Sequence, residues 1–130
     1  MARYAGFVSD KVRWAIYARG AYCCCYCGVD MSDDHGKLSL DHVIPWETSV
    51  RNSGKADHRP QNLIVCCKLC NSSRGTKPLS AFVQAAGILV RILEQTSTDL
   101  TREDVAAGQV AYLADRARRE YGQREQEQVA

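Results

Sequence analysis

Two pairs of cysteines at metal-ligand spacing are the residues of this sequence that most clearly could do chemistry. Cys24 and Cys27 lie in the run GAYCCCYCG, and Cys67 and Cys70 follow in CCKLCN, with 39 residues between the two pairs. Two residues between thiols allow one tight turn to aim both sulfurs at one point, and two such turns supply the tetrahedral set that structural zinc prefers. The pattern therefore predicts a structural Zn²⁺ site with these four cysteines as ligands.

Three further cysteines, Cys23, Cys25 and Cys66, adjoin these pairs, and buried free thiols are their simplest interpretation. Cys25 or Cys66 would serve as a ligand if a turn were shifted by one residue. A disulfide framework fits poorly, because seven is an odd number of cysteines and cytoplasmic thiols stay reduced. A disulfide oxidoreductase also fits poorly, since the βαβ pattern expected around a redox C-x-x-C pair is missing.

The segment between the cysteine pairs carries side chains that can activate water and hold a divalent cation. Metal-assisted hydrolysis needs both a base and such a cation. His42, in LSLDHVIP, offers a neutral imidazole as the base, and Asp41 offers a hard carboxylate to a divalent cation. Asn71, directly after the last cysteine, adds an amide oxygen. Two protein ligands suffice for Mg²⁺, which usually keeps several waters.

Positive charge lies close by, at Arg74 and Lys77. Arg74 follows Asn71 by three positions, so the two share a helical face from which the guanidinium could reach a phosphate oxygen. Solvated surface charges are an alternative for both cations. Structural alternatives also stay open for the other residues: His42 as a strand histidine bonded to backbone, Asp41 as a strand end, Asn71 as a cap of the second cysteine turn.

Short elements must position these residues. Ser9 followed by DKVRWAIYARG predicts a capped helix that ends at Gly20. LSLDHVIP predicts a strand that stops at Pro45, NLIVCC a second strand, and KLCNSSRG a short helix. The polar residues 46–61 predict a long loop.

Strand alternation would place Asp41 and His42 on opposite faces of the first strand. Both can serve one site only if the strand ends, bulges or twists there, and the nearby Pro45 favours such an interruption.

After residue 78 the sequence predicts two helices, at about 79–94 and 101–121, the second opened by a capping box from Thr101 to Asp104. The polar residues 122–130 are expected to fray. Residues 1–78 carry 11 Lys and Arg against 7 Asp and Glu, whereas residues 79–130 carry 6 against 8. The first part can therefore accept a polyanionic partner, and the second is unsuited to broad contact with a phosphate backbone.

The length of 130 residues suits one small domain. No apolar run approaches the roughly 18 residues of a membrane span, and residues 1–14 contain no apolar signal-peptide core. We therefore expect no membrane partner and a cytoplasmic location.

The motifs C-x-x-C-G, D-H-x-x-P, N-L and C-x-x-C-N-x-x-R-G, in this order, resemble the HNH endonucleases of the ββα-metal fold over about residues 10–78. The resemblance implies an α+β fold: a small zinc-stapled ββα-metal domain with an N-terminal helix and C-terminal helices. It implies an HNH core over residues 1–78. The helices expected over 79–121 lie outside the resemblance, and we expect them to pack on this core as an extension. The family is named after three motif residues, of which the third is commonly histidine. Asn71 stands at that position here, so this sequence is similar to the H-N-N variant. A neutral amide oxygen suits hard Mg²⁺ or Mn²⁺.

The resemblance further implies a metal-dependent endonuclease that nicks or cuts double-stranded DNA by a one-metal mechanism. His42 would be the general base, and Asp41 and Asn71 would hold the catalytic Mg²⁺ or Mn²⁺. Asn62, the family's middle asparagine, would hold the long loop and orient the base. Arg74 and Lys77 would contact DNA.

A homodimer would be required to cut both strands at once, and a free-standing nuclease of this size suits a bacterium or a bacteriophage. The alternative is a non-catalytic zinc module that binds nucleic acid or protein. Replacement of His42 by alanine separates the two hypotheses, because a binding module should tolerate it and a nuclease should not.

Overall fold

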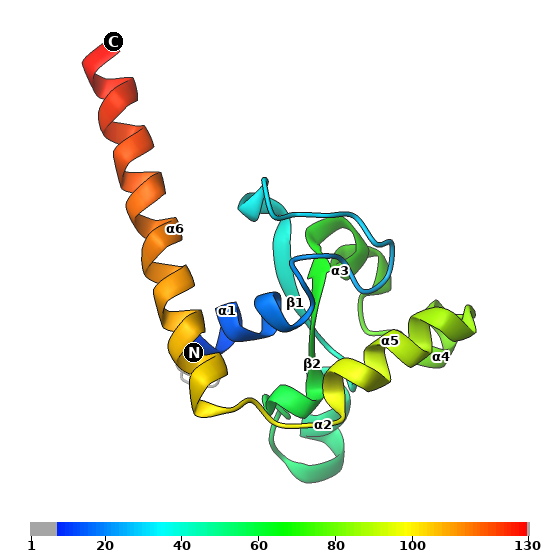
Figure 1. The fold of residues 1–130 in the computed structure, drawn as a ribbon. Helices are drawn as coiled ribbons and strands as arrows, with labels where there is room; N and C mark the ends of the chain where they lie inside the picture. The colour runs from blue at the N-terminus through cyan, green and yellow to red at the C-terminus, as the bar shows by residue number, and fades with distance from the viewer. Residues whose placement is uncertain (1–7, 130) are drawn as a thin grey trace.

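A two-stranded antiparallel sheet lies at the centre of the protein, whose computed structural model describes residues 8–129 (Figure 1). Strand β1 (Leu38–His42) pairs with β2 (Leu63–Cys67). The register is regular, from Leu38 opposite Cys67 to His42 opposite Leu63. All five residues of β2 are buried, whereas β1 is buried only in part. The apolar run LIVCC is therefore the middle of the core.

Two helices flank the sheet. Helix α3 (Lys68–Arg74) follows β2 directly, and together with the strands it forms the strand–strand–helix unit that the sequence predicts. Helix α1 (Asp10–Arg19) begins after Ser9, whose side chain makes no capping hydrogen bond within the described residues. Gly20 ends it, and a Cβ at Gly20 would collide with the Val65 side chain of β2. The fold is thus a small α+β unit of the ββα type, as predicted.

The core joins α1, the cysteine-rich turn, β2 and α5. Its buried members include aromatic, aliphatic and cysteine side chains: Trp14, Tyr17, Cys24, Cys25, Tyr26, Met31, Leu38, Ile64, Val65, Cys66, Val83 and Ile92. A short 3₁₀ turn, η1 (His35–Lys37), leads from the cysteine-rich turn into β1.

The segment between the strands contains regular structure, so the prediction of a plain loop over residues 46–61 is wrong. Helix α2 (Trp46–Ser53) begins after Pro45 and ends at Gly54, which has a φ of 81° and donates its N–H to the Val50 carbonyl. A 3₁₀ turn, η2 (Pro60–Asn62), then leads into β2. The helix is short and polar, so its clearest signals were the proline before it and the left-handed glycine after it.

The C-terminal part departs from the prediction in its boundaries. The first expected helix is divided into α4 (Leu79–Phe82) and α5 (Ala86–Thr96), with the buried Val83 in extended conformation between them. Helix α6 (Arg102–Val129) begins at the predicted capping box, since the Thr101 N–H donates to Asp104 and the Asp104 N–H donates to the Thr101 hydroxyl. It continues beyond residue 121, where we expected its end and a frayed tail.

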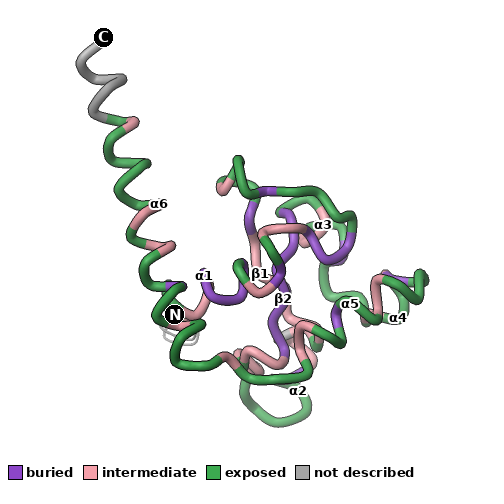
Figure 2. The backbone as a smooth tube through the Cα atoms, viewed as in Figure 1, coloured by how far each residue is buried: buried purple, intermediate pink, exposed green. Residues whose placement is uncertain are grey.

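Helix α6 packs against α1 near its own start and then projects away from the rest of the protein (Figure 1). Gly108 marks the crossing, because a Cβ there would collide with the Lys11 carbonyl and lie 2.7 Å from the Ala15 nitrogen. Up to residue 123, most of the projecting part is exposed (Figure 2). Among the described residues, no helix is long and apolar enough to cross a membrane.

Candidate zinc cluster and active-site pocket

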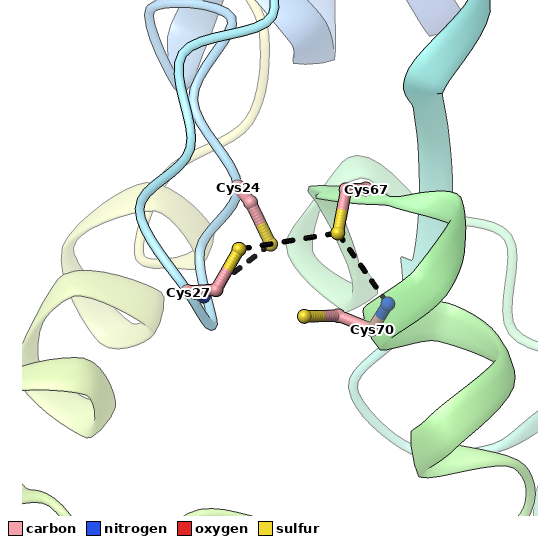
Figure 3. A group of neighbouring side chains, drawn as sticks. All are labelled: Cys24, Cys27, Cys67 and Cys70. Atoms are coloured by element: carbon pink, nitrogen blue, oxygen red, sulfur yellow. Dashed lines mark hydrogen bonds between the residues drawn. The ribbon is translucent and has the colours of Figure 1, made fainter.

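The four cysteines predicted as zinc ligands converge on one point (Figure 3). Their sulfurs all lie within 4.8 Å of one another, and the sulfurs of Cys27 and Cys67 are 3.9 Å apart. Tetrahedral zinc, with Zn–S bonds of about 2.3 Å, holds its sulfurs about 3.8 Å apart. Cys24 and Cys27 approach from the turn after α1, and Cys67 and Cys70 from the start of α3 (Figure 3). The donor set therefore fits zinc.

Backbone N–H groups close each cysteine turn. Cys27 donates its N–H to Cys24 Sγ over 3.5 Å, and Cys70 donates to Cys67 Sγ over 3.4 Å. Burial would raise the pKa of the Cys24 thiol, but backbone donors, those of Cys27 and Cys67 first, lower that pKa to about 7. Because the thiolate is the form that binds metal, this shift favours the ligating state of Cys24.

The other cysteines lie apart from the cluster. Cys25 and Cys66 are fully buried, and the Cys25 thiol donates to Gln95 Oε1 over 3.2 Å. Burial raises the pKa of Cys25 to about 11, so it stays a neutral thiol. Cys23 is half-buried. The structure therefore selects the unshifted set of four ligands.

A pocket of about 330 Å³ opens where the end of β1 meets α3. Asp41, His42 and Asn71 all line it, although they come from different elements. His42 is the last residue of β1, and the pairing is regular up to it. The strand end, rather than a bulge, thus allows neighbouring residues of β1 to share one cavity. The other lining residues are Leu40, Pro45, Glu47, Gly75 and Thr76.

The Asn71 amide is held by its nitrogen. Nδ2 donates to Ser39 Oγ over 2.7 Å and to the Leu40 carbonyl over 3.0 Å. Among the described residues nothing donates to its oxygen, so that end of the amide can serve as a ligand. A carboxylate and an amide oxygen in one pocket form the hard donor set that Mg²⁺ or Mn²⁺ prefers, and Asp41 with Asn71 therefore fits such a cation.

The Asp41 carboxylate is buried, and two groups donate to its Oδ2: Arg74 Nη1 over 2.9 Å and the Tyr26 hydroxyl. Arg74 is fully buried as well. Its N–H groups also donate over 2.6–3.1 Å to three backbone carbonyls, those of His42, Val43 and Lys77. Burial alone would lower the pKa of the Arg74 guanidinium, but the negative charge of Asp41 helps to keep that pKa above its usual value.

The expected contact between Arg74 and a phosphate is therefore corrected by the structure. A side chain with no exposed surface cannot reach DNA, and its donors are engaged inside the protein. Helical spacing did place Arg74 beside Asn71, but spacing cannot tell an inward face from an outward one. Lys77, in contrast, is exposed, and its ammonium donates to the Ser73 carbonyl over 3.1 Å.

Asn62 is buried and joins the two ends of the segment between the strands. Its Oδ1 accepts from the Ile44 N–H over 2.8 Å, while its Nδ2 donates to the carbonyls of Ile44 and Asp57 over 3.2 and 2.9 Å. One amide thus holds the residues after β1 against the residues that precede η2.

His58 contacts His42, a contact that the sequence did not reveal. His42 Nε2 and His58 Nδ1 are 2.8 Å apart. His58 lies in the polar stretch 46–61, where no periodicity indicates contacts, so the sequence did not predict that it reaches His42. Its position depends on the bonds of Asn62 to its neighbour Asp57, which only the folded loop provides.

We predict that acid inactivates the pocket only at low pH. Burial, followed by repulsion from His58, lowers the pKa of His42 below its usual 6.5, although Asp41, Asp57 and Glu47 act in the opposite direction. If His42 is the general base of a hydrolysis, it works when neutral, and the rate should then be retained at pH 6.5 and fall with a midpoint below that value. Rates between pH 5 and 8 check this, and a midpoint above 6.5 would contradict it. Replacing His58 by asparagine should raise the midpoint.

Comparison with known proteins gives a family match and a similar relative. Residues 24–77 match the family model described as HNH endonuclease. Over 85 residues the chain is 29% identical to the CRISPR-associated endonuclease Cas9 of Actinomyces naeslundii, an alignment that covers 64% of this chain and 7% of that protein. The chain thus corresponds to a small part of the length of that relative. The family match contains both cysteine pairs and the pocket residues Asp41, His42 and Asn71.

Proposed function

We propose, from the premise that residues 24–77 form an HNH endonuclease domain, that this protein is a metal-dependent endonuclease that hydrolyses phosphodiester bonds of double-stranded DNA. The single observation that carries the proposal is the shared pocket of Asp41, His42 and Asn71. A base and two hard oxygen ligands from β1 and α3 meet there, beside a separate cysteine cluster. A zinc module that only binds would require the cluster alone.

His42 acts as the general base. Its Nε2 lies against His58, so with Nε2–H as the donor the other ring nitrogen, Nδ1, accepts the proton of the attacking water. The lowered pKa keeps the imidazole neutral near pH 7. Asn62 supports this arrangement, because it holds the loop segment next to His58.

Asp41 and Asn71 would hold the catalytic cation in the pocket. When bound, Mg²⁺ or Mn²⁺ supplies Lewis-acid stabilisation of the charge that develops on the phosphate. Asp41 contributes the negative charge, and Asn71 contributes a neutral oxygen that its two nitrogen contacts keep in place. Lys77, exposed just beyond Gly75 and Thr76 at the pocket, contacts a neighbouring phosphate of the DNA backbone.

The zinc-loaded protein, mixed with supercoiled plasmid, tests the proposal. Nicked or linear product should form with added Mn²⁺ or Mg²⁺ and not in their absence. Asn71→Ala should need about 10–100-fold more Mn²⁺ for the same rate. Linear product formed without a nicked precursor would indicate the homodimer that double-strand cleavage requires. A folded, zinc-loaded protein that binds the plasmid and never cuts it would favour the non-catalytic module instead.

A further inference from the structure

Tyr26 connects the cysteine cluster with the pocket. It lies between Cys25 and Cys27 in the first cysteine turn and is buried, with its ring packed edge-on against Phe82 at 5.1 Å between centroids. Its hydroxyl donates to Asp41 Oδ2 and accepts from Arg74 Nη1 over 3.2 Å. The turn that supplies two zinc ligands thus also supplies a contact to the pocket carboxylate.

The second cysteine pair supplies the other contact to the same oxygen. Arg74 lies one helical turn after Cys70 in α3, and its Nη1 donates to Asp41 Oδ2. The segment of the first cysteine pair therefore supplies the Tyr26 hydroxyl, and the segment of the second pair supplies the Arg74 guanidinium. Both donate to the carboxylate of Asp41 in β1. Folding of the cluster brings the two donors together around Asp41.

Two donors on one carboxylate oxygen restrict the rotation of the carboxylate. With Oδ2 engaged inside the protein, Oδ1 is the oxygen left for the pocket that Asp41 lines. A phenol is protonated near neutral pH, so the Tyr26 hydroxyl can remain a donor to this oxygen. Hydrogen bonds of this kind orient the ligands of metal sites.

We propose that Tyr26 is a positioning residue of the active site, whose hydroxyl, with Arg74, fixes Asp41 Oδ2 so that Oδ1 faces a hard divalent cation. The proposal rests on the proposed function, in which Asp41 holds that cation. Tyr26, which lies in the sequence between two of the predicted zinc ligands, thus determines part of the affinity of the pocket for Mg²⁺ or Mn²⁺.

Tyr26→Phe tests the proposal, because it removes the hydroxyl and keeps the ring against Phe82. Mn²⁺ affinity is measured on the zinc-loaded protein from the electron paramagnetic resonance signal of free Mn²⁺. We expect Tyr26→Phe to bind Mn²⁺ about 10–100-fold more weakly than the wild type, with the zinc content and the KM for DNA unchanged. Its cleavage rate should recover at saturating Mn²⁺.

Tyr17→Phe is the matched control. Tyr17 is also buried, and its hydroxyl accepts a hydrogen bond from Arg13 over 3.2 Å, but it belongs to α1 and makes no contact with Asp41 among the described residues. Its Mn²⁺ affinity should equal that of the wild type.

Each other outcome decides a specific point. A folded Tyr26→Phe with wild-type Mn²⁺ affinity would overturn the positioning role, and so would a variant that has lost zinc, since Tyr26 would then act on the cluster. A wild type that neither binds Mn²⁺ nor cuts DNA would instead overturn the proposed function on which the role rests.

Discussion

A Cys67→Ser variant is expected to lose cooperative folding. Cys67 is the last residue of β2 and the N-cap of α3, where its sulfur accepts the Cys70 N–H. Loss of a zinc ligand removes metal binding that in small zinc modules is worth on the order of 10 kcal/mol of folding free energy. A domain of this size has about 5–15 kcal/mol of total stability, so little should be left.

Far-ultraviolet circular dichroism and thermal melting, with zinc content measured on the same samples, check this prediction. Removal of zinc from the wild type with a chelator should reproduce the variant's behaviour. Cys23→Ser is the matched control, because Cys23 is a half-buried thiol outside the cluster, and it should keep both zinc and the melting transition. A zinc-free Cys67→Ser protein that melts within a few degrees of the wild type would show that the cluster does not hold the fold together.

An Arg74→Met variant is expected to be destabilised by about 3–5 kcal/mol, the usual cost of removing one partner from a buried ion pair. The change leaves Asp41 buried with only the Tyr26 hydroxyl, and it removes the donors to three backbone carbonyls. Urea denaturation of the zinc-loaded proteins measures the effect.

Lys77→Met is the control for the loss of one positive charge. Lys77 is exposed, so its replacement should change the unfolding free energy by no more than about 0.5 kcal/mol. Adding Asp41→Asn to Arg74→Met should restore part of the lost stability, because the unpaired charge is then removed. If Arg74→Met kept wild-type stability and lost only DNA affinity, a direct phosphate contact would be the better explanation.

The four-cysteine cluster, both strands and α3 could be predicted because their signals are local. C-x-x-C spacing defines a turn, and the apolar run LIVCC defines a buried strand without information from the rest of the chain. The convergence of Asp41, His42 and Asn71 in one pocket was predicted from motif order. Pro45 favoured an interruption of the first strand, and the fold shows that this interruption is a strand end at His42 rather than a bulge.

The features that the sequence did not reveal depend on tertiary contacts. Arg74 looks like a surface cation because its partners, Tyr26 and Asp41, are 48 and 33 residues away in the chain. His58 reaches His42 only because Asn62 holds the intervening segment. Helix α2 was missed because its stretch is polar and carries Pro45 and Gly54, which favour a loop as readily as the start and end of a helix.

Cleavage of supercoiled plasmid by His42→Ala, compared with the wild type at matched zinc content and saturating Mn²⁺, tests the central claim most directly. His35→Ala is the control, because His35 pairs with Asp115 over 2.8 Å and does not line the pocket. Removing a general base should slow cleavage by at least about 10²-fold, while His35→Ala should cut at the wild-type rate. Equal rates for His42→Ala and the wild type would contradict the assignment of this pocket as the hydrolytic site.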